Sequence, residues 1–231
     1  MPATALPSSG DQPVPAAKSC DASGMAEIHR MFRSGFREAP KLVGNVADGN
    51  AAQAEIVGDH LATLSISLHA HHEGEDTLVW DRLEQRAPSC ITHVERMKQH
   101  HAQLLVHLLE MDAALPAWRA SGRGTDAAPV LSALVGINEA LAIHLPDEEL
   151  NIVPVMEAVL TQKEVDGLSE HGRKSTPKGK TWQQLGAILA SQPDGGDEWL
   201  HKNLPAPVRL IWRLVGKPNY EKSRKALVGA S

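Results

Sequence analysis

Four long stretches of this chain carry apolar residues in alternating steps of three and four, the spacing of residues along one face of an α-helix. These stretches predict helices at about 25–46, 51–86, 89–115 and 129–160. Alternation with a period of two, which would indicate strands, is scarce. Four amphipathic helices in succession predict an all-α fold, an up-down antiparallel four-helix bundle.

Segments that contain glycine or proline place the ends of these helices. The first helix is expected to end at "ADGN", the second before Pro88 and the third at Pro116. The stretch that follows, "PAWRASGRGTDAAP", is typical of a loop. Pro154 lies near the end of the fourth helix and predicts a kink there.

Composition divides the chain into three parts, at 1–23, 24–165 and 166–231. The first part is rich in Pro, Ala and Ser and predicts a disordered tail, and the second holds the four-helix bundle. The third part predicts a C-terminal helical extension with several Trp residues and a basic end. We expect this extension to pack on the bundle, with binding to a protein partner or a membrane surface as the alternative.

The overall composition argues against several classes of protein. A net charge of −5 does not favour nucleic acid as the partner. The two cysteines, Cys20 and Cys90, stand in unrelated contexts, which suits a reducing compartment and excludes a thiolate zinc finger. No apolar run reaches the roughly 18 residues of a membrane helix, and no signal peptide is recognisable. We therefore expect a cytoplasmic protein without an integral membrane segment.

Ionisable residues interrupt the apolar seam of the second helix. The seam runs through Leu61, Leu64, Leu68, His71, Glu75 and Leu78. His71 and Glu75 thus occupy positions where leucine is expected, facing the core. The stretch "LHAHHEGEDTLVW" holds two other His–acid pairs of the same spacing. The pair that starts at His69 follows a weaker stripe, and the pair that starts at His72 lies at the edge of the seam, so the His71 pair is favoured.

The other three helices carry matching residues. On the fourth seam His144 and Glu148 repeat the same one-turn spacing, and the third and first seams place His101 and His29 inward. At ~1.5 Å of rise per residue, their distances from the predicted turns bring all four helices' residues to one level of the core. The predicted site is His29, His71, Glu75, His101, His144 and Glu148.

Burying four imidazoles and two carboxylates without compensation would cost several kcal/mol or more. Two divalent or trivalent cations supply that compensation, and carboxylates able to bridge favour a binuclear centre. Imidazole with carboxylate suits iron or manganese better than zinc or a sulfur cluster. His60 lies roughly 16 Å further along its helix and is too distant to join the site.

Nearby acids are candidates for orienting the histidines from outside the metal site. They are Glu73, Asp76, Asp147 and Glu149, and each is equally plausible as a solvated charge. The remaining histidines of the bundle, at positions 69, 93, 100 and 107, are expected to face solvent or to lie behind the ligands.

The order of the six site residues, with His-x3-Glu pairs in second and fourth place, resembles the hemerythrin-like (HHE cation-binding) proteins. The resemblance covers roughly 22–160, and "HRMFR", "HHEGED", "PAWRA" and "LPAPVRLIWRLVG" are similar to an actinobacterial subgroup. It implies a bundle around a non-haem di-iron centre, two iron ions with an oxo or hydroxo bridge, manganese being less favoured. Oxygen-carrying members have an extra His one turn from the third-helix ligand. Here Met97 or Leu105 takes that place, so simple oxygen transport is not expected.

The resemblance implies a protein that binds or reacts with a small oxidant: oxygen, hydrogen peroxide or nitric oxide. Peroxide decomposition or nitric oxide handling is favoured, as a catalase-like or other oxidoreductase activity with no catalytic residue beyond the metal centre. The alternative is an iron- or oxygen-sensing regulatory module without turnover, whose extension contacts a protein partner. A metal-free structural bundle would require the six buried polar residues to satisfy one another.

Overall fold

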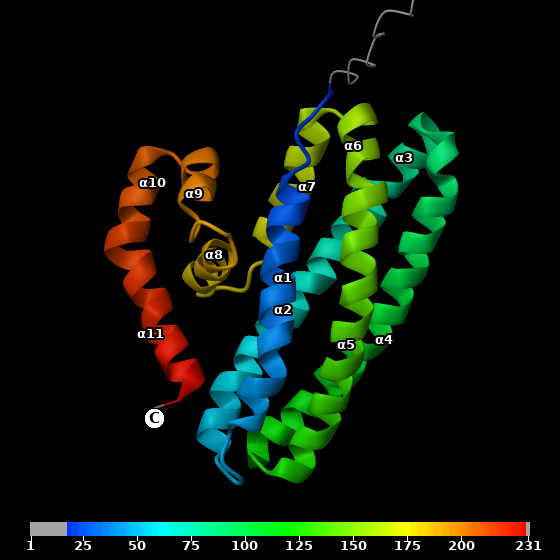
Figure 1. Cartoon of the computed structure of the whole chain (residues 1–231). Coiled ribbons are helices and arrows are strands. Elements are labelled where there is room, and N and C mark those ends of the chain that lie inside the picture. Colours follow the sequence, from blue (N-terminus) through cyan, green and yellow to red (C-terminus); the bar gives the residue numbers. More distant parts are fainter. Residues whose placement is uncertain (1–17, 230–231) are drawn as a thin grey trace, which may run out of the picture.

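The computed structural model describes residues 18–229, and this part of the chain is built from helices without a strand. Four long antiparallel helices form the bundle (Figure 1). Their bounds are α1 Gly24–Gly44, α2 Ala51–Leu78 with its continuation α3 Trp80–Arg86, α4 Ile91–Ser121, and α5 Gly124–Asn151 with its continuation α6 Val153–Val159. A 3-10 turn, Pro88–Cys90, joins α3 to α4. The predicted all-α four-helix bundle is confirmed.

The connection between α4 and α5 is shorter than the sequence predicts. α4 passes through Pro116, and only Gly122 and Arg123 separate it from α5, so the predicted loop is wrong. Gly122 ends α4 in the left-handed region, at φ 64°, and its amide donates to the Trp118 carbonyl. A proline inside a helix costs about 3 kcal/mol. Burial of the Trp118 side chain in the same turn contributes roughly 4–6 kcal/mol and offsets that cost.

The second and fourth helices each break one turn after their seam glutamate. The breaks fall at Val79 and Ile152, whose amides still donate to the Glu75 and Glu148 carbonyls at 2.9 Å. The second helix was predicted to be continuous, and this prediction is wrong because the helix breaks at Val79. The kink predicted at Pro154 begins two residues earlier, at Ile152. The two distortions lie at equivalent places in the bundle.

Two apolar clusters fill the bundle at different heights. The large apolar core lies toward the end of the bundle that carries the α1–α2 and α4–α5 turns, and it includes Phe36, Leu61, Leu108, Trp118 and Leu134. The small apolar core lies at the other end and includes Met25, Trp80, Leu83, Met97 and Met156. Along every seam, the level between the two cores is occupied by the ionisable residues that the sequence singled out.

The N-terminal tail was predicted to extend over 1–23, but its last residues are packed. The Ser19 hydroxyl donates to the carbonyls of Glu157 and Leu160, at 3.0 and 2.6 Å. Cys20 and Ala22 are buried in the end of the bundle. The prediction is therefore wrong for 18–23, and its remainder, 1–17, lies outside the described residues.

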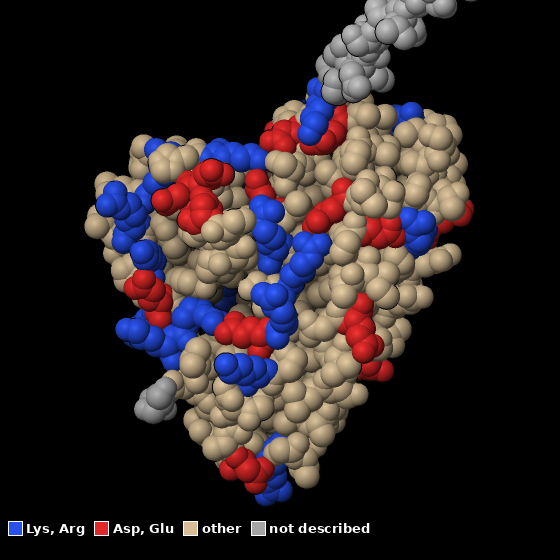
Figure 2. Space-filling model, in the orientation of Figure 1, with Lys and Arg blue, Asp and Glu red and all other residues tan. Residues whose placement is uncertain are grey.

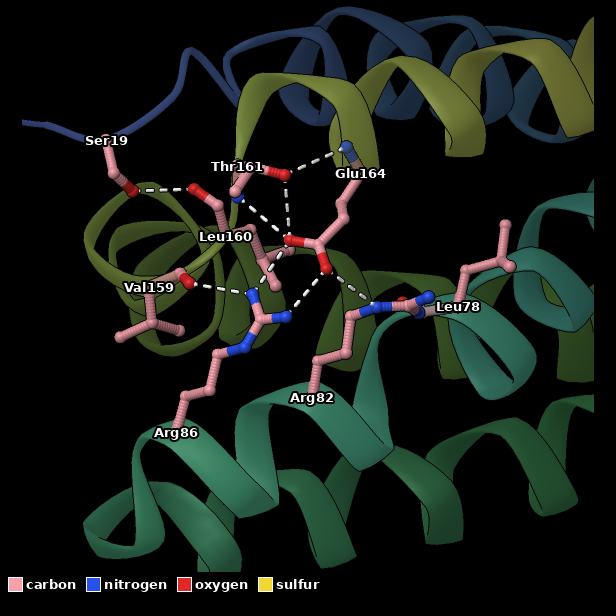
Figure 3. A network of polar contacts seen from close by, with 8 residues as sticks. All are labelled: Ser19, Leu78, Arg82, Arg86, Val159, Leu160, Thr161 and Glu164. Atoms are coloured by element: carbon pink, nitrogen blue, oxygen red, sulfur yellow. Dashed lines mark hydrogen bonds and ion pairs between the residues drawn. The ribbon is translucent and has the colours of Figure 1, made fainter.

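A capping box starts the C-terminal extension. The Thr161 hydroxyl accepts from the Glu164 amide, and the Glu164 carboxylate accepts from the Thr161 amide. The same carboxylate pairs with Arg82 at 3.0 Å and with Arg86 at 2.7 Å (Figure 3). Arg86 also donates to the Val159 carbonyl, so this network joins α3, the end of α6 and the start of the extension.

The extension folds back along α1 and α2 (Figure 1). Its helices are α7 Gln162–Lys174, α8 Thr181–Ala190, α9 Asp197–Asn203, α10 Ala206–Ile211, the π turn Trp212–Gly216 and α11 Lys217–Val228. Ile188 and Leu227 join the large apolar core, and the Arg224 guanidinium pairs with Glu38 at 2.5 Å. The predicted domain boundary at residue 165 falls inside α7.

The stretch Gly124–Val159 is long and apolar enough to cross a membrane, with a mean hydropathy of 1.5 over 18 residues. Within the described structure it is a core helix of the bundle, and 44% of that window is buried. It carries His144 and Glu148 toward the interior. A helix of this kind passes the hydropathy test because it is buried among other helices.

Candidate metal centre

Seven ionisable side chains form a buried layer between the two apolar cores. They are His29 from α1, His71, His72 and Glu75 from α2, His101 from α4, and His144 and Glu148 from α5. None is more than 8% exposed, and His29, Glu75, His144 and Glu148 are fully buried. The structure brings together all six residues predicted from the sequence and adds His72.

The layer divides into two groups, each with four side-chain atoms within 4.8 Å of one another. The first group consists of His29, His71, Glu75 and Glu148. The second consists of His72, Glu75, His101 and His144. Because Glu75 belongs to both groups, its carboxylate can bridge two cations. Imidazole nitrogens and carboxylate oxygens are donors that suit iron, manganese or zinc.

The two oxygens of Glu75 face different histidines. Oε1 lies 3.1 Å from His71 Nε2, and Oε2 lies 3.3 Å from His101 Nε2. One oxygen of Glu148 similarly lies 3.4 Å from His29 Nε2 and 3.5 Å from His144 Nε2. Each glutamate therefore lies between a histidine of the first group and one of the second.

Many of these close atoms make no hydrogen bond. Both oxygens of Glu75 and of Glu148 are buried without a hydrogen-bond partner among the described residues, as is Nε2 of His72, His101 and His144. An unpaired buried polar group costs about 1–3 kcal/mol, and more when it is charged. This many orphaned donor atoms at one place fit a site completed by cations, and they argue against a metal-free network in which the residues satisfy one another.

Carboxylates behind two of the histidines fix their orientation. His101 Nδ1 lies 2.9 Å from Asp76 Oδ1, which also accepts a 2.6 Å hydrogen bond from the Trp80 indole. His29 Nδ1 lies 2.9 Å from Glu149 Oε1. A hydrogen bond from Nδ1 to a carboxylate leaves the Nε2 lone pair free to bind a cation.

Asp76 and Glu149, two of the four outer acids predicted from the sequence, thus lie behind histidines of the layer. The other two lie elsewhere: Glu73 approaches His171 at 3.7 Å, and Asp147 binds Arg96 through both oxygens.

His72 is the residue that sequence reasoning placed at the edge of the seam. Its ring stacks on that of His101, with centroids 4.1 Å apart and planes 23° apart. The signal for it was present in the adjacent histidines of "HAHHEGE", since two consecutive helical residues can both face a wide interior.

The other histidines stay outside both groups. His60 is half-buried beside the extension, where desolvation lowers its pKa to about 4, and it belongs to neither group. His69 approaches Asp112 at 3.4 Å, and His107 approaches Glu110 at 3.0 Å. The His100 ring lies behind His144, with centroids 5.8 Å apart.

A comparison with protein-family models matches residues 21–158 to the hemerythrin HHE cation-binding domain. The chain belongs to the hemerythrin HHE family. Comparisons with curated proteins and with solved structures gave no match. The matched residues span the bundle and include all seven residues of the layer. A hemerythrin HHE domain binds cations, which agrees with the orphaned donors between the two cores. The C-terminal extension lies beyond the matched region.

The electrostatics of the hemerythrin layer show why it requires cations. Burial raises the pKa of Glu75, and burial together with the nearby Glu75 charge raises that of Glu148 to about 8. Burial also lowers the pKa of His71, and it lowers that of His144 to about 2, so both imidazoles stay neutral. Bound cations would displace the carboxyl protons and use the free nitrogen lone pairs.

The pKa of His101 shifts in the opposite direction from the pKa values of His71, His72 and His144. Burial alone would lower its pKa, but its contacts with Asp76 and Glu75 outweigh burial and raise the pKa to about 10. In the metal-free layer this imidazole therefore retains a proton, which a cation must displace before Nε2 can bind it.

Proposed function

We propose that this hemerythrin-family protein holds two iron ions in the layer and reacts there with a small oxidant. Hydrogen peroxide and nitric oxide are favoured over reversible oxygen transport. His29, His71 and Glu148 would hold one iron and His72, His101 and His144 the other, with Glu75 shared by both. The observation that carries the proposal is the set of orphaned buried donors divided into two groups around Glu75.

Bound iron would supply redox chemistry and coordination positions open to a small molecule. Each group offers four protein atoms, fewer than the six of an octahedral ion, so such positions would remain. The protein encloses them with the Phe32 and Trp80 rings, whose centroids lie 5.2 Å from the His71 ring and 5.7 Å from the His101 ring. Since every layer residue is buried, a molecule of few atoms fits better than an organic substrate.

The set of metal-binding side chains differs from that expected for oxygen carriers in the helix that supplies the fifth imidazole. The number of imidazoles does not differ. Met97, one turn before His101, is fully buried in the small apolar core, and Leu105, one turn after it, is exposed. α4 therefore supplies one imidazole to the layer, and the fifth imidazole comes from His72 on α2. The His72 ring stacks on that of His101, so this side of the layer is closely packed.

A second candidate function is an iron or oxygen sensor without turnover. It is favoured by the close approach of the extension to α2 at Gly74, between His71 and Glu75. A Cβ atom placed on Gly74 would lie 2.7 Å from Leu168 Cδ1 and 3.2 Å from His171 Cδ2, both on α7. A change in α2 on metal binding would therefore reach the extension directly.

The proposal is tested by the metal content and visible spectrum of aerobically purified protein. We expect about two irons per chain and the absorption of a bridged di-iron centre. His71→Ala and His144→Ala should each abolish that absorption, because they remove donors from different groups. His107→Ala, a histidine outside both groups, is the matched control and should leave metal content and spectrum unchanged.

Titration with peroxide or nitric oxide then separates the two candidate functions. Many equivalents of oxidant consumed per chain indicate an enzyme, and a single stoichiometric change indicates a sensor. Folded protein without iron, or with unchanged iron in both site variants, would contradict the proposed site.

A further inference from the structure

One long helix forms the outer edge of the extension. α10, the π turn and α11 continue from Ala206 to Val228 along the side of the molecule opposite α4 (Figure 1). Four large apolar side chains in the first half of this helix lie in solvent: Leu210, Ile211, Leu214 and Val215, which are 54%, 48%, 69% and 53% exposed. We name these four residues the apolar strip.

The packing of the opposite face fixes the direction of the apolar strip. Trp212 is buried toward α8, with its ring centroid 6.4 Å from that of Trp182 and 6.4 Å from that of Tyr220. A Cβ atom placed on Gly216 would lie 2.4 Å from Trp212 and 2.7 Å from Trp182, so this face admits no larger residue. The helix therefore cannot rotate to bury the strip against its own domain.

The π turn Trp212–Gly216 aligns the strip. Hydrogen bonds that close over five residues rather than four widen the turn, so residues four apart stay close to one line along the helix. Leu210 and Leu214 form one such line, and Ile211 and Val215 form the other. π turns are rare and occur frequently at functional sites.

Cations accompany the strip along the same helix. They are Arg209, Arg213, Lys217, Lys222, Arg224 and Lys225, against the single acid Glu221. Arg224 is paired with Glu38, whereas Arg213, Lys217 and Lys222 form no ion pair within residues 18–229. Lys and Arg side chains accordingly gather on the surface over α10 and α11, at the left edge of Figure 2. This local excess contrasts with the net charge of −5 of the whole chain.

We infer that the helix Ala206–Val228 docks on the surface of an anionic lipid bilayer. The apolar strip enters the boundary between headgroups and acyl chains, and Arg213, Lys217 and Lys222 contact lipid phosphates. An exposed apolar face flanked by unpaired cations matches the physical requirements of an interfacial helix. A second copy of the chain fits less well, because two-fold pairing through this face would bring the same row of cations from both copies to one contact.

The test is sedimentation of the full protein with vesicles of phosphatidylcholine alone and of phosphatidylcholine mixed with phosphatidylglycerol. We expect binding to the mixed vesicles at least ~10-fold tighter than to the neutral ones. Leu210→Ser combined with Val215→Ser should reduce binding to the mixed vesicles by ~10-fold or more. The matched control is Val106→Ser combined with Leu109→Ser on α4, residues that are 53% and 55% exposed and should leave binding unchanged.

Arg213→Gln combined with Lys217→Gln tests the electrostatic contribution to vesicle binding. This variant should lose most of the preference for anionic vesicles, and wild-type binding should weaken as salt is raised. Equal wild-type affinity for both vesicles, or unchanged binding by the strip variant, would overturn the inference. It would also be overturned if light scattering showed a dimer that the strip variant converts to a monomer, because a second copy would then cover the strip.

Discussion

On α2, Leu61 and Leu68 and then His71 and Glu75 follow one seam into the same bundle interior. The leucines belong to the large apolar core, whose side chains need only one another. The histidine and the glutamate enter the layer, where buried oxygens and nitrogens make no hydrogen bond. Equal burial thus leads to opposite expectations: the apolar core should stabilise the fold by itself, whereas the layer should stabilise it fully only with cations bound.

Glu75→Gln should have the largest effect on the layer, because Glu75 is the residue that both groups share. The amide is neutral and offers one oxygen instead of two, so we expect the loss of both cations. Metal analysis of the purified protein measures this directly. His29→Ala, which touches the first group only, should retain the cation of the second group; if both variants lose the same amount of metal, Glu75 is not the shared ligand.

Leu108→Ala should destabilise the large apolar core whether or not metal is bound. Leu108 is 1% exposed, and removing a buried leucine side chain typically costs about 2–5 kcal/mol. Denaturant unfolding of the metal-loaded and the metal-free protein should give the same loss of free energy. A loss that differs strongly between the two forms would show that the core and the layer are not independent.

Glu148→Leu should raise the free energy of unfolding of the metal-free protein, whereas Leu108→Ala lowers it. It replaces a buried carboxyl without hydrogen bonds by an apolar side chain, and replacements of this kind range from neutral to stabilising by about 4 kcal/mol. Denaturant unfolding in the presence of a chelator measures the gain, and metal analysis should show the loss of the first group's cation. Glu148→Gln keeps an uncharged polar group at the same place and should give no gain; a gain with Gln would show that Glu148 is charged in the metal-free protein, against its raised pKa.

The stability of the metal-free protein should be greatest near pH 6.5. Below that pH, His71, His72 and His144 are protonated in the unfolded chain but stay neutral in the folded protein, because burial lowers their pKa values. Stability therefore rises with pH in this range. Glu148 and His101 act in the opposite direction, because their raised pKa values of about 8 and 10 keep protons bound in the folded state. The loss of stability from Glu148 begins near pH 4.5 and that from His101 near pH 6.5, so above pH 6.5 stability falls. Each group contributes up to about 1.4 kcal/mol per pH unit.

Urea unfolding with a chelator across this pH range measures the profile. Stabilisation by added metal should grow with pH, because binding releases these protons. A metal-free profile without a maximum would contradict the proposed protonation states.

The contrast between core and layer also explains what the sequence could predict. His71 and Glu75 were identified because a charged residue stands out where a seam requires leucine. His72 was missed because the seam rule allows one inward residue per turn, whereas the layer takes neighbouring residues of α2. Its burial depends on the approach of His101 from another helix, which spacing along one chain does not contain.

Helix ends were harder to predict than the helices themselves. Pro116 was predicted to end the helix because a proline inside a helix costs about 3 kcal/mol. The burial of Trp118 that offsets this cost is a tertiary contact. The break at Val79 likewise carries no glycine or proline and has no local signal. Local rules therefore located the helices and most of the layer, and tertiary contacts decided the rest.

Asp76→Asn should have the smallest of the predicted effects. Asp76 accepts from His101 Nδ1 and does not belong to either group of ligand atoms, so it orients the imidazole without binding metal. Loss of such a partner typically lowers metal affinity 10–100-fold. Competition with a chelator measures this change in affinity. Asp147→Asn is the matched control: Asp147 lies close to the layer but pairs with Arg96, and its substitution should leave affinity unchanged. Equal losses in both variants would mean that the general negative charge around the layer, rather than the hydrogen bond to His101, supports the cation.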